Sequence, residues 1–144
     1  MEFETGIKTI SESMFSNCKN LRFIELPSSV EKIEGDAFAE CALQKIDLPE
    51  NINTIESYAF RECDSLTFVT IPPKVTSINS GTFYSCDFLE KVNIHDEVKY
   101  IANDAFDRCD KLTICGIKGS YAEQYANEHN IPFEELDATI EFLN

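Results

Sequence analysis

The chain has 144 residues with 26 acidic and 12 basic side chains, so its formal net charge at pH 7 is −14. Binding to nucleic acid or to anionic lipid surfaces depends mainly on basic groups, so both classes of partner are excluded. The length and the hydrophobic content of 43% suit one folded domain. No apolar run is long enough for a membrane-spanning helix or a signal-peptide core, and we expect a soluble chain without membrane insertion.

One pattern recurs along the chain. Each copy has Leu-x-x-(Ile/Val)-x-(Leu/Ile)-Pro, then (Val/Ile)-x-x-Ile, then a small residue and Phe, with Cys three positions later. The phenylalanines Phe15, Phe38, Phe60, Phe83 and Phe106 follow one another at steps of 23, 22, 23 and 23 residues, and so do the cysteines Cys18, Cys41, Cys63, Cys86 and Cys109. The one short step reflects a deletion between Cys41 and Leu43. This periodicity predicts an α/β solenoid of about five 22–23-residue repeats, in which each unit buries its apolar face on its neighbours.

The chain begins within a repeat, after a short lead-in over residues 1–5. Ile7 and Ile10 occupy the positions of Val75 and Ile78 in a later copy, and Met14 stands where later copies have alanine or threonine. No segment before them has the pattern of a cap. We therefore expect an exposed first rung, a rung that pairs with another chain, or a natural protein that continues upstream.

Three elements are predicted within each repeat. Short parallel strands are expected at Phe23–Leu26, Lys45–Leu48, Phe68–Ile71 and Lys91–Ile94, where side chains alternate between outward and inward. Proline ends the first three, because it removes a ladder donor, and His95 replaces it in the fourth. A second extended side follows, as in Val75 and Ile78. A single helical turn then closes the coil, with good N-cap residues in one column: Gly35, Ser57, Ser80 and Asn103.

The cysteine column has two interpretations. Cysteine is among the most often buried residues and behaves as a small hydrophobe, which favours a ladder of free, packed thiols. Disulfides between neighbouring strands are sterically possible, although five cysteines in a row cannot all pair. Spacings of 22 or 23 residues lack the close pairs that zinc sites use.

The end of the chain departs from the repeat. In the fifth copy, Leu112 to Ile117, Cys115 is predicted at the inward position and Ile114 and Gly116 at outward ones. Ser120 and Glu123 then form a capping box before a helix whose apolar side comprises Tyr121, Ala122, Tyr125, Ala126 and His129. We therefore expect one domain over residues 1–144, with repeats over about 7–117, a C-terminal cap over 118–133 and an acidic tail over 134–144. The tail has enough apolar residues for a docked strand or short helix, and disorder is the alternative.

The repeat resembles a known family. Leu-x-x-Ile-x-Leu-Pro, Val-x-x-Ile and Ala-Phe-x-x-Cys, complete in Leu21 to Cys41, resemble the BspA-type leucine-rich repeat, and the cap from Gly119 to Phe133 is similar to the ending of many such proteins. The resemblance implies a right-handed solenoid with a concave parallel sheet. It also implies mucosal bacterial and protist proteins, many of them exported or anchored at the cell surface and linked to adhesion and protein binding. It carries no catalytic residue.

No catalytic or metal-binding motif is present in the sequence. His95 and His129 stand alone and are expected to be structural or solvated. Acidic pairs such as Asp47 and Glu50, or Glu134 and Glu135, could chelate a cation weakly, but a solvated acidic surface is the simpler interpretation. No cofactor and no enzymatic activity are expected.

The outward strand positions are free of the packing demand of the repeat, so recognition is expected there. The predicted partner-binding residues are Phe23, Glu25, Lys45, Asp47, Phe68, Thr70, Lys91 and Asn93. Their alternative role is to supply β-propensity. The first functional hypothesis is a non-enzymatic module that binds a protein or peptide, with a host or extracellular ligand as one option. The second is self-assembly as a homodimer through Ile7, Ile10 and Met14. The chain could act at the cell surface, or in the cytoplasm given its lack of a signal sequence.

Overall fold

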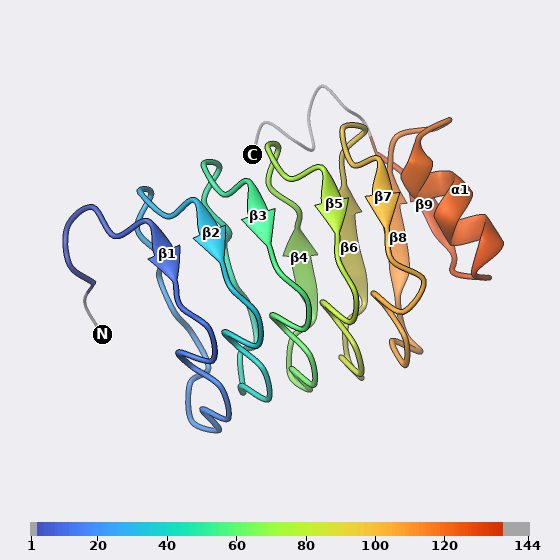
Figure 1. Cartoon of the computed structure of the whole chain (residues 1–144). Coiled ribbons are helices and arrows are strands. Elements are labelled where there is room, and N and C mark those ends of the chain that lie inside the picture. Colours follow the sequence, from blue (N-terminus) through green and yellow to red (C-terminus); the bar gives the residue numbers. More distant parts are fainter. Residues whose placement is uncertain (1–2, 137–144) are drawn as a thin grey trace.

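The computed structural model of the protein describes residues 3–136. The chain winds into successive coils that stack along one axis, with a helix at the C-terminal end (Figure 1). Every strand pair is parallel. The fold is therefore the parallel solenoid predicted from the repeat, and its core lies inside the coils.

One side of each coil carries a two-residue strand, at the second extended segment of the repeat. These strands are β1 (Thr9–Ile10), β2 (Lys32–Ile33), β3 (Thr54–Ile55), β5 (Ser77–Ile78) and β7 (Tyr100–Ile101). They form one sheet in the order β1-β2-β3 and a second in the order β5-β7. Between the two sheets, the side-chain amide of Asn79 donates to the carbonyl of Ile55 at 2.6 Å, which links β3 to the next coil.

The opposite side of the coils is called the strand face, and it contains the proline-ended segments of the repeat. Its four strands β4 (Phe68–Thr70), β6 (Lys91–Ile94), β8 (Thr113–Gly116) and β9 (Phe133–Glu135) pair in that order. The strands predicted at Phe68–Ile71 and Lys91–Ile94 are thus confirmed. The segments Phe23–Leu26 and Lys45–Leu48 also belong to this face, but they are not strands of the sheet.

A stack of phenylalanines runs through the core. The rings of Phe15, Phe38, Phe60, Phe83 and Phe106 lie nearly parallel, with neighbouring centroids 5.3–5.5 Å apart. Edge-on contacts close both ends, at 6.1 Å from Phe3 to Phe15 and at 6.2 Å from Tyr125 to Phe106. A repeat of nearly constant length therefore places one aromatic ring per coil at van der Waals distance from the next.

The five cysteines of the repeat column, Cys18, Cys41, Cys63, Cys86 and Cys109, pack beside this stack and form no disulfide. The thiol of Cys63 donates to the carbonyl of Phe38 at 3.1 Å, and three other thiols make the equivalent bond to the phenylalanine of the preceding coil. Burial raises the pKa of the Cys41 thiol to about 11 and raises that of Cys63 well above its ordinary value. The packing role predicted for the cysteine column is confirmed by these contacts.

The prediction that a helical turn closes each repeat is wrong. These segments form consecutive turns, in which residues with left-handed backbone recur, for example Glu40 and Glu62 at φ of 58° and 55°. Their backbone amides donate to the next coil, as Phe38 does to Ala59 at 2.8 Å and Glu40 to Arg61 at 2.9 Å. A helix would direct these amides to its own carbonyls. The turns instead use them to join neighbouring coils.

In the fifth copy, the predicted inward and outward positions are wrong. Ile114, not Cys115, pairs with the inward Val92, and Cys115 pairs with Asn93, the outward column. Ile114 and Cys115 are both buried. The observed register differs from the predicted one by one residue. Because side chains alternate along a strand, this difference exchanges the predicted inward and outward positions in the fifth copy. Gly116 now takes the inward position of Ile94, where a Cβ would lie 3.2 Å from the ring of Phe133 and 3.6 Å from Ala122.

The C-terminal cap is the helix α1 (Tyr121–Glu128) followed by β9. Ser120 accepts a bond from the Glu123 amide at 3.4 Å, and the Glu123 carboxylate accepts one from the Gly119 amide at 2.9 Å, so the predicted capping interaction is present. The buried Tyr125 hydroxyl donates to the carbonyl of Ala102 at 3.0 Å, and burial raises its pKa. Part of the predicted tail forms β9, while residues 137–144 lie outside the described residues.

Candidate partner-binding face

A groove opens on the strand face between the first two coils. Its volume is about 900 Å³. It is lined by Phe23, Ile24, Glu25, Leu26, Ser28, Lys45, Asp47, Leu48 and Pro49. Phe23 is 65% exposed, the largest fraction among the large apolar side chains of the described chain that are exposed. An exposed aromatic beside a groove of this size is a suitable anchor position for a partner.

The backbone around this groove is not paired into a sheet. Within residues 3–136, no backbone hydrogen bond joins Phe23–Leu26 to Lys45–Leu48, or Lys45–Leu48 to β4. Bonds exist only at the margins, from the Gln44 amide to the Arg22 carbonyl at 3.0 Å and from the Thr67 amide to the Gln44 carbonyl at 3.3 Å. The inward side chains Ile24 and Leu48 are consequently half-exposed. In Figure 1 the same coils have no arrows on this side.

The deletion in the second repeat coincides with this loss of pairing. In the other copies a turn brings the leucine amide to the cysteine carbonyl three residues earlier, as from Leu66 to Cys63 at 3.2 Å and from Leu89 to Cys86 at 3.1 Å. Only one residue separates Cys41 from Leu43, so this turn is absent, and the Ala42 amide donates instead to the Cys18 carbonyl at 3.3 Å. The strand segment after the deletion therefore starts from a different connection.

The electrostatic character of the groove is weakly acidic. Lys45 forms an exposed ion pair with Asp47 at 3.7 Å. Glu25 is exposed and makes no ion pair among the described residues. The groove therefore has one negative charge that no neighbouring cation offsets, on a chain with a net charge of −14.

The other predicted binding residues lie on the paired part of the strand face. Phe68 is opposite Lys91, and Thr70 is opposite Asn93, whose amide nitrogen lies 3.3 Å from the Thr70 hydroxyl. Asn93 is buried, and Lys91 is held by Glu134 at 3.3 Å. Phe68 stays 39% exposed. The structure therefore divides the eight predicted residues into four that line the groove and four on β4 and β6, and three of these last four make internal contacts.

The first rung differs from its prediction. Ile10 is fully buried, so this residue of the predicted self-association set presents no surface at the N-terminal end. Phe3 packs against the core and contacts Phe15, and it covers part of this end. Ile7 is half-buried and Met14 is 41% exposed. Of the three residues predicted for self-association, Met14 and part of Ile7 are therefore available for contact with another chain.

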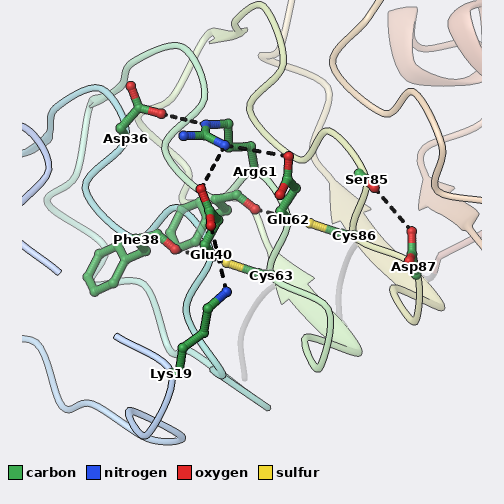
Figure 2. Close-up of polar contacts among 11 residues, drawn as sticks. Lys19, Asp36, Phe38, Glu40, Arg61, Glu62, Cys63, Ser85, Cys86 and Asp87 are labelled. Atoms are coloured by element: carbon green, nitrogen blue, oxygen red, sulfur yellow. Dashed lines mark hydrogen bonds and ion pairs between the residues drawn. The ribbon is translucent and has the colours of Figure 1, made fainter. Parts of the chain in front are cut away.

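The turns on the phenylalanine side carry a different, charged cluster. Arg61 donates to Asp36 at 2.8 Å and to Glu40 at 3.2 Å, and lies 3.5 Å from Glu62 (Figure 2). The hydrogen bond that Arg61 donates to Asp36, together with the charges of the surrounding carboxylates, raises the pKa of Arg61. The pKa of Asp64 is raised by burial and by the charges of Asp87 and Glu62. The ion pairs of Arg61 join two neighbouring coils, which is a structural role.

The two histidines have structural contacts. The Nε2 atom of buried His95 lies 2.8 Å from the carbonyl of Pro72, and its Nδ1 accepts the Glu97 amide at 3.2 Å. The ring of His129 stacks on Tyr125 with centroids 3.9 Å apart. His129 also lines a smaller cavity of about 310 Å³ between the last coil and the cap. No group of His, Cys, Asp and Glu within residues 3–136 is arranged to hold a metal ion.

No helix in the described part of the chain is long and apolar enough to cross a membrane. This agrees with the absence of long apolar runs in the sequence.

Comparison with known proteins decides the family. The model of the BspA type leucine rich repeat region matches residues 1–113 in six copies. The chain belongs to this family. A repeat of this family commonly mediates protein interaction or adhesion and is typically non-enzymatic. No curated protein matches the chain.

The solved structure of one relative supports the same assignment. A leucine-rich repeat protein of T. pallidum superposes with a TM-score of 0.72 and 32% identity, over 76% of this chain and 52% of that protein. A leucine-rich cell surface protein of Faecalibacterium prausnitzii aligns with 20% identity and a TM-score of 0.49, over 94% of this chain and 59% of that protein. The chain therefore spans about half the length of the first of these relatives.

Sequence reasoning identified the groove residues Phe23, Glu25, Lys45 and Asp47 as outward positions, but it did not predict the groove. Ile24, Leu26 and Leu48 were assigned to the interior of paired strands. The sequence feature that could have located the groove is the one-residue deletion between Cys41 and Leu43, because it removes the turn that precedes the segment Lys45–Leu48.

Proposed function

We propose that this chain is a non-enzymatic recognition module that binds a protein or peptide at the N-terminal part of the strand face, with adhesion at a cell surface as its setting. The observation that supports the proposal is the exposed Phe23 beside the groove of about 900 Å³. Family membership adds support, because repeats of this kind commonly serve as interaction modules. Adhesion rests on the family alone.

The expected mechanism is burial of an aromatic anchor. Covering the Phe23 side chain with a partner would contribute about 1.5–3 kcal/mol. The groove-lining Ile24 and Leu48 would add further apolar contact, since both are half-exposed in the free chain. Affinity is therefore built from several modest contacts, and the acidic chain favours basic partners whose binding weakens with salt.

The proposal is tested by selecting a displayed peptide library against the immobilised chain and measuring the binding of enriched peptides to two variants. Phe23→Ser removes the proposed anchor. Phe88→Ser is the matched control, because Phe88 is also 50% exposed but packs under Lys111 and does not line the groove. We expect about tenfold weaker binding to Phe23→Ser and unchanged binding to Phe88→Ser. Equal binding to all three proteins would contradict the proposal.

Self-assembly through the first rung is the alternative function, and Met14 is the exposed residue that favours it. Ile10 is unsuitable for a test because its substitution would disturb the core. Sedimentation over a range of concentrations should show a dimer that dissociates on Met14→Glu if this alternative holds. A monomer at every concentration would remove it.

A further inference from the structure

The cysteine column ends beside a cavity. Cys109 is the last cysteine of the column and is 9% exposed, whereas Cys63 and Cys86 are fully buried. Together with Tyr125 and His129, Cys109 lines the cavity of about 310 Å³ between the last coil and the cap, which is called the cap cavity below. A small molecule that enters the cap cavity can therefore reach Cys109.

The thiol of Cys109 also contacts a thiol of the preceding coil. A backbone hydrogen bond joins the two coils directly before both cysteines, from the Ser85 amide to the Asp107 carbonyl at 2.8 Å. Cys86 and Cys109 therefore occupy matching positions on adjacent coils, and their side chains lie in hydrogen-bonding contact. Parallel backbones joined by hydrogen bonds lie ~4.8 Å apart, and a disulfide spans Cα separations of about 4.4–6.8 Å. A disulfide between these two thiols is therefore compatible with the spacing of the coils.

We propose that Cys109 is an oxidation site for hydrogen peroxide, and that Cys86 converts the oxidised thiol to a disulfide between the last two coils. In the first step the sulfur of Cys109 attacks one peroxide oxygen, the O–O bond breaks, and water leaves, so that Cys109 becomes a sulfenic acid. In the second step the sulfur of Cys86 attacks that of Cys109, the S–O bond breaks, and a second water leaves. The two thiols thereby lose two electrons and two protons, and the peroxide is reduced to water.

The surroundings of the two thiols assign the order of these steps. The hydrogen bond from Cys86 lowers the pKa of the Cys109 thiol, although burial and the nearby carboxylates of Asp110 and Asp87 act in the opposite direction. The same hydrogen bond and burial raise the pKa of the Cys86 thiol. Because the thiolate is the nucleophilic form, Cys109 is the thiol that attacks the peroxide.

The surrounding packing holds the two coils together while the bonds to sulfur change. Each thiol donates to the phenylalanine carbonyl of the preceding coil, at 3.1 Å for Cys86 and 3.0 Å for Cys109, and the disulfide replaces these two bonds. The stacked rings of Phe83 and Phe106, 5.4 Å apart, and the backbone bonds between the coils do not involve the sulfur atoms. The coils therefore stay joined while the cysteine side chains rotate.

The test treats the folded chain with hydrogen peroxide, blocks the remaining thiols and maps the products by mass spectrometry without reduction. Trypsin cleaves after lysine and arginine, which places each of the six cysteines on a different peptide. We expect the peptide of Cys109 to be cross-linked to that of Cys86. Cys109 should also be modified at least about tenfold faster than the buried Cys63 and Cys115.

Two variants separate the two chemical steps. In Cys86→Ala the sulfenic acid of Cys109 has no thiol to condense with, so a 1,3-diketone that traps sulfenic acids should label Cys109 at least about tenfold more than in the unmodified chain. Cys115→Ala is the matched control, because it removes another buried cysteine that lies outside the column. This control should leave the yield of the cross-link unchanged.

Three outcomes would overturn the proposal. If Cys109 in the unmodified chain reacted no faster than Cys63, the cap cavity would not give access to this thiol. Oxidation of Cys109 without a cross-link to Cys86 would remove the second step. A cross-link found between two chains instead of within one would show that the contact between adjacent coils does not form it. The groove beside Phe23 shares no lining residue with the cap cavity, so this chemistry is independent of the proposed function.

Discussion

The two halves of the strand face have the same sequence pattern but different backbone pairing. From β4 to β9, four strands form a continuous parallel sheet, and inward residues such as Val69 and Val92 are fully buried. At Phe23–Leu26 and Lys45–Leu48 the backbones are unpaired, and two of the four inward side chains, Ile24 and Leu48, are half-exposed. The pattern of apolar residues therefore determines which side chains face inward, while pairing also depends on the connection that precedes each strand.

The phenylalanine side of the same coils is unaffected. Phe38 and Phe60 lie 5.3 Å apart across the shortened repeat, the same distance as Phe15 and Phe38. The deletion lies after Cys41, outside the turns that position these rings. The change that coincides with the one-residue deletion is thus confined to the strand face, at Phe23–Leu26 and Lys45–Leu48.

The largest expected effect is on the aromatic stack. Phe60→Ala removes a fully buried ring that stacks on Phe38 and Phe83, and should lower the free energy of unfolding by about 3–5 kcal/mol in urea titrations. Phe23→Ala, at 65% exposure, should cost less than about 1 kcal/mol. Similar losses in the two variants would show that the groove region carries as much stability as the stack.

The next largest expected effect is a loss of stability at alkaline pH, because the buried thiols ionise there. The folded pKa of Cys41 is about 11, against an ordinary value of 9.0. Because the pKa of Cys41 is raised in the folded state, the protonated thiol contributes its full stabilisation below about pH 9. This stabilisation is lost as the pH rises towards 11. The slope should reach at most about 1.4 kcal/mol per pH unit for one such thiol. Cys41→Ala should have a shallower slope between pH 9 and 11 than the unmodified chain, and an identical slope would refute the assignment.

The smallest expected effect tests whether the deletion causes the difference between the two halves of the strand face. Inserting one serine between Ala42 and Leu43 restores the spacing of the other repeats and the turn that joins leucine to cysteine, and should stabilise the chain by about 1 kcal/mol. Amides of Lys45–Leu48 should exchange at least about tenfold more slowly, because they can now pair with neighbouring coils. If the exchange rates of these amides did not change, the deletion would not be the cause of the unpaired backbone.

Several elements could be predicted because their determinants are local or periodic. The spacing of Phe15 to Phe106 specified the stack, and Ser120 with Glu123 specified the start of α1. The binding residues could be predicted only as outward positions. Their division into a groove and a paired sheet depends on hydrogen bonds between coils, which no side-chain pattern reports.

The sequence by itself determined the repeat, its family, the inward and outward columns of the first four copies, and the C-terminal cap, since these follow from periodicity and side-chain polarity. Only the tertiary structure decided the register of β8, where packing of Ala122 and Phe133 leaves room for glycine at the inward position. It also decided that left-handed turns replace helical ones and that Phe23–Leu26 stays unpaired. These features depend on which backbone amide meets which carbonyl on the adjacent coil, and small shifts between coils change that pairing without changing the pattern of apolar residues.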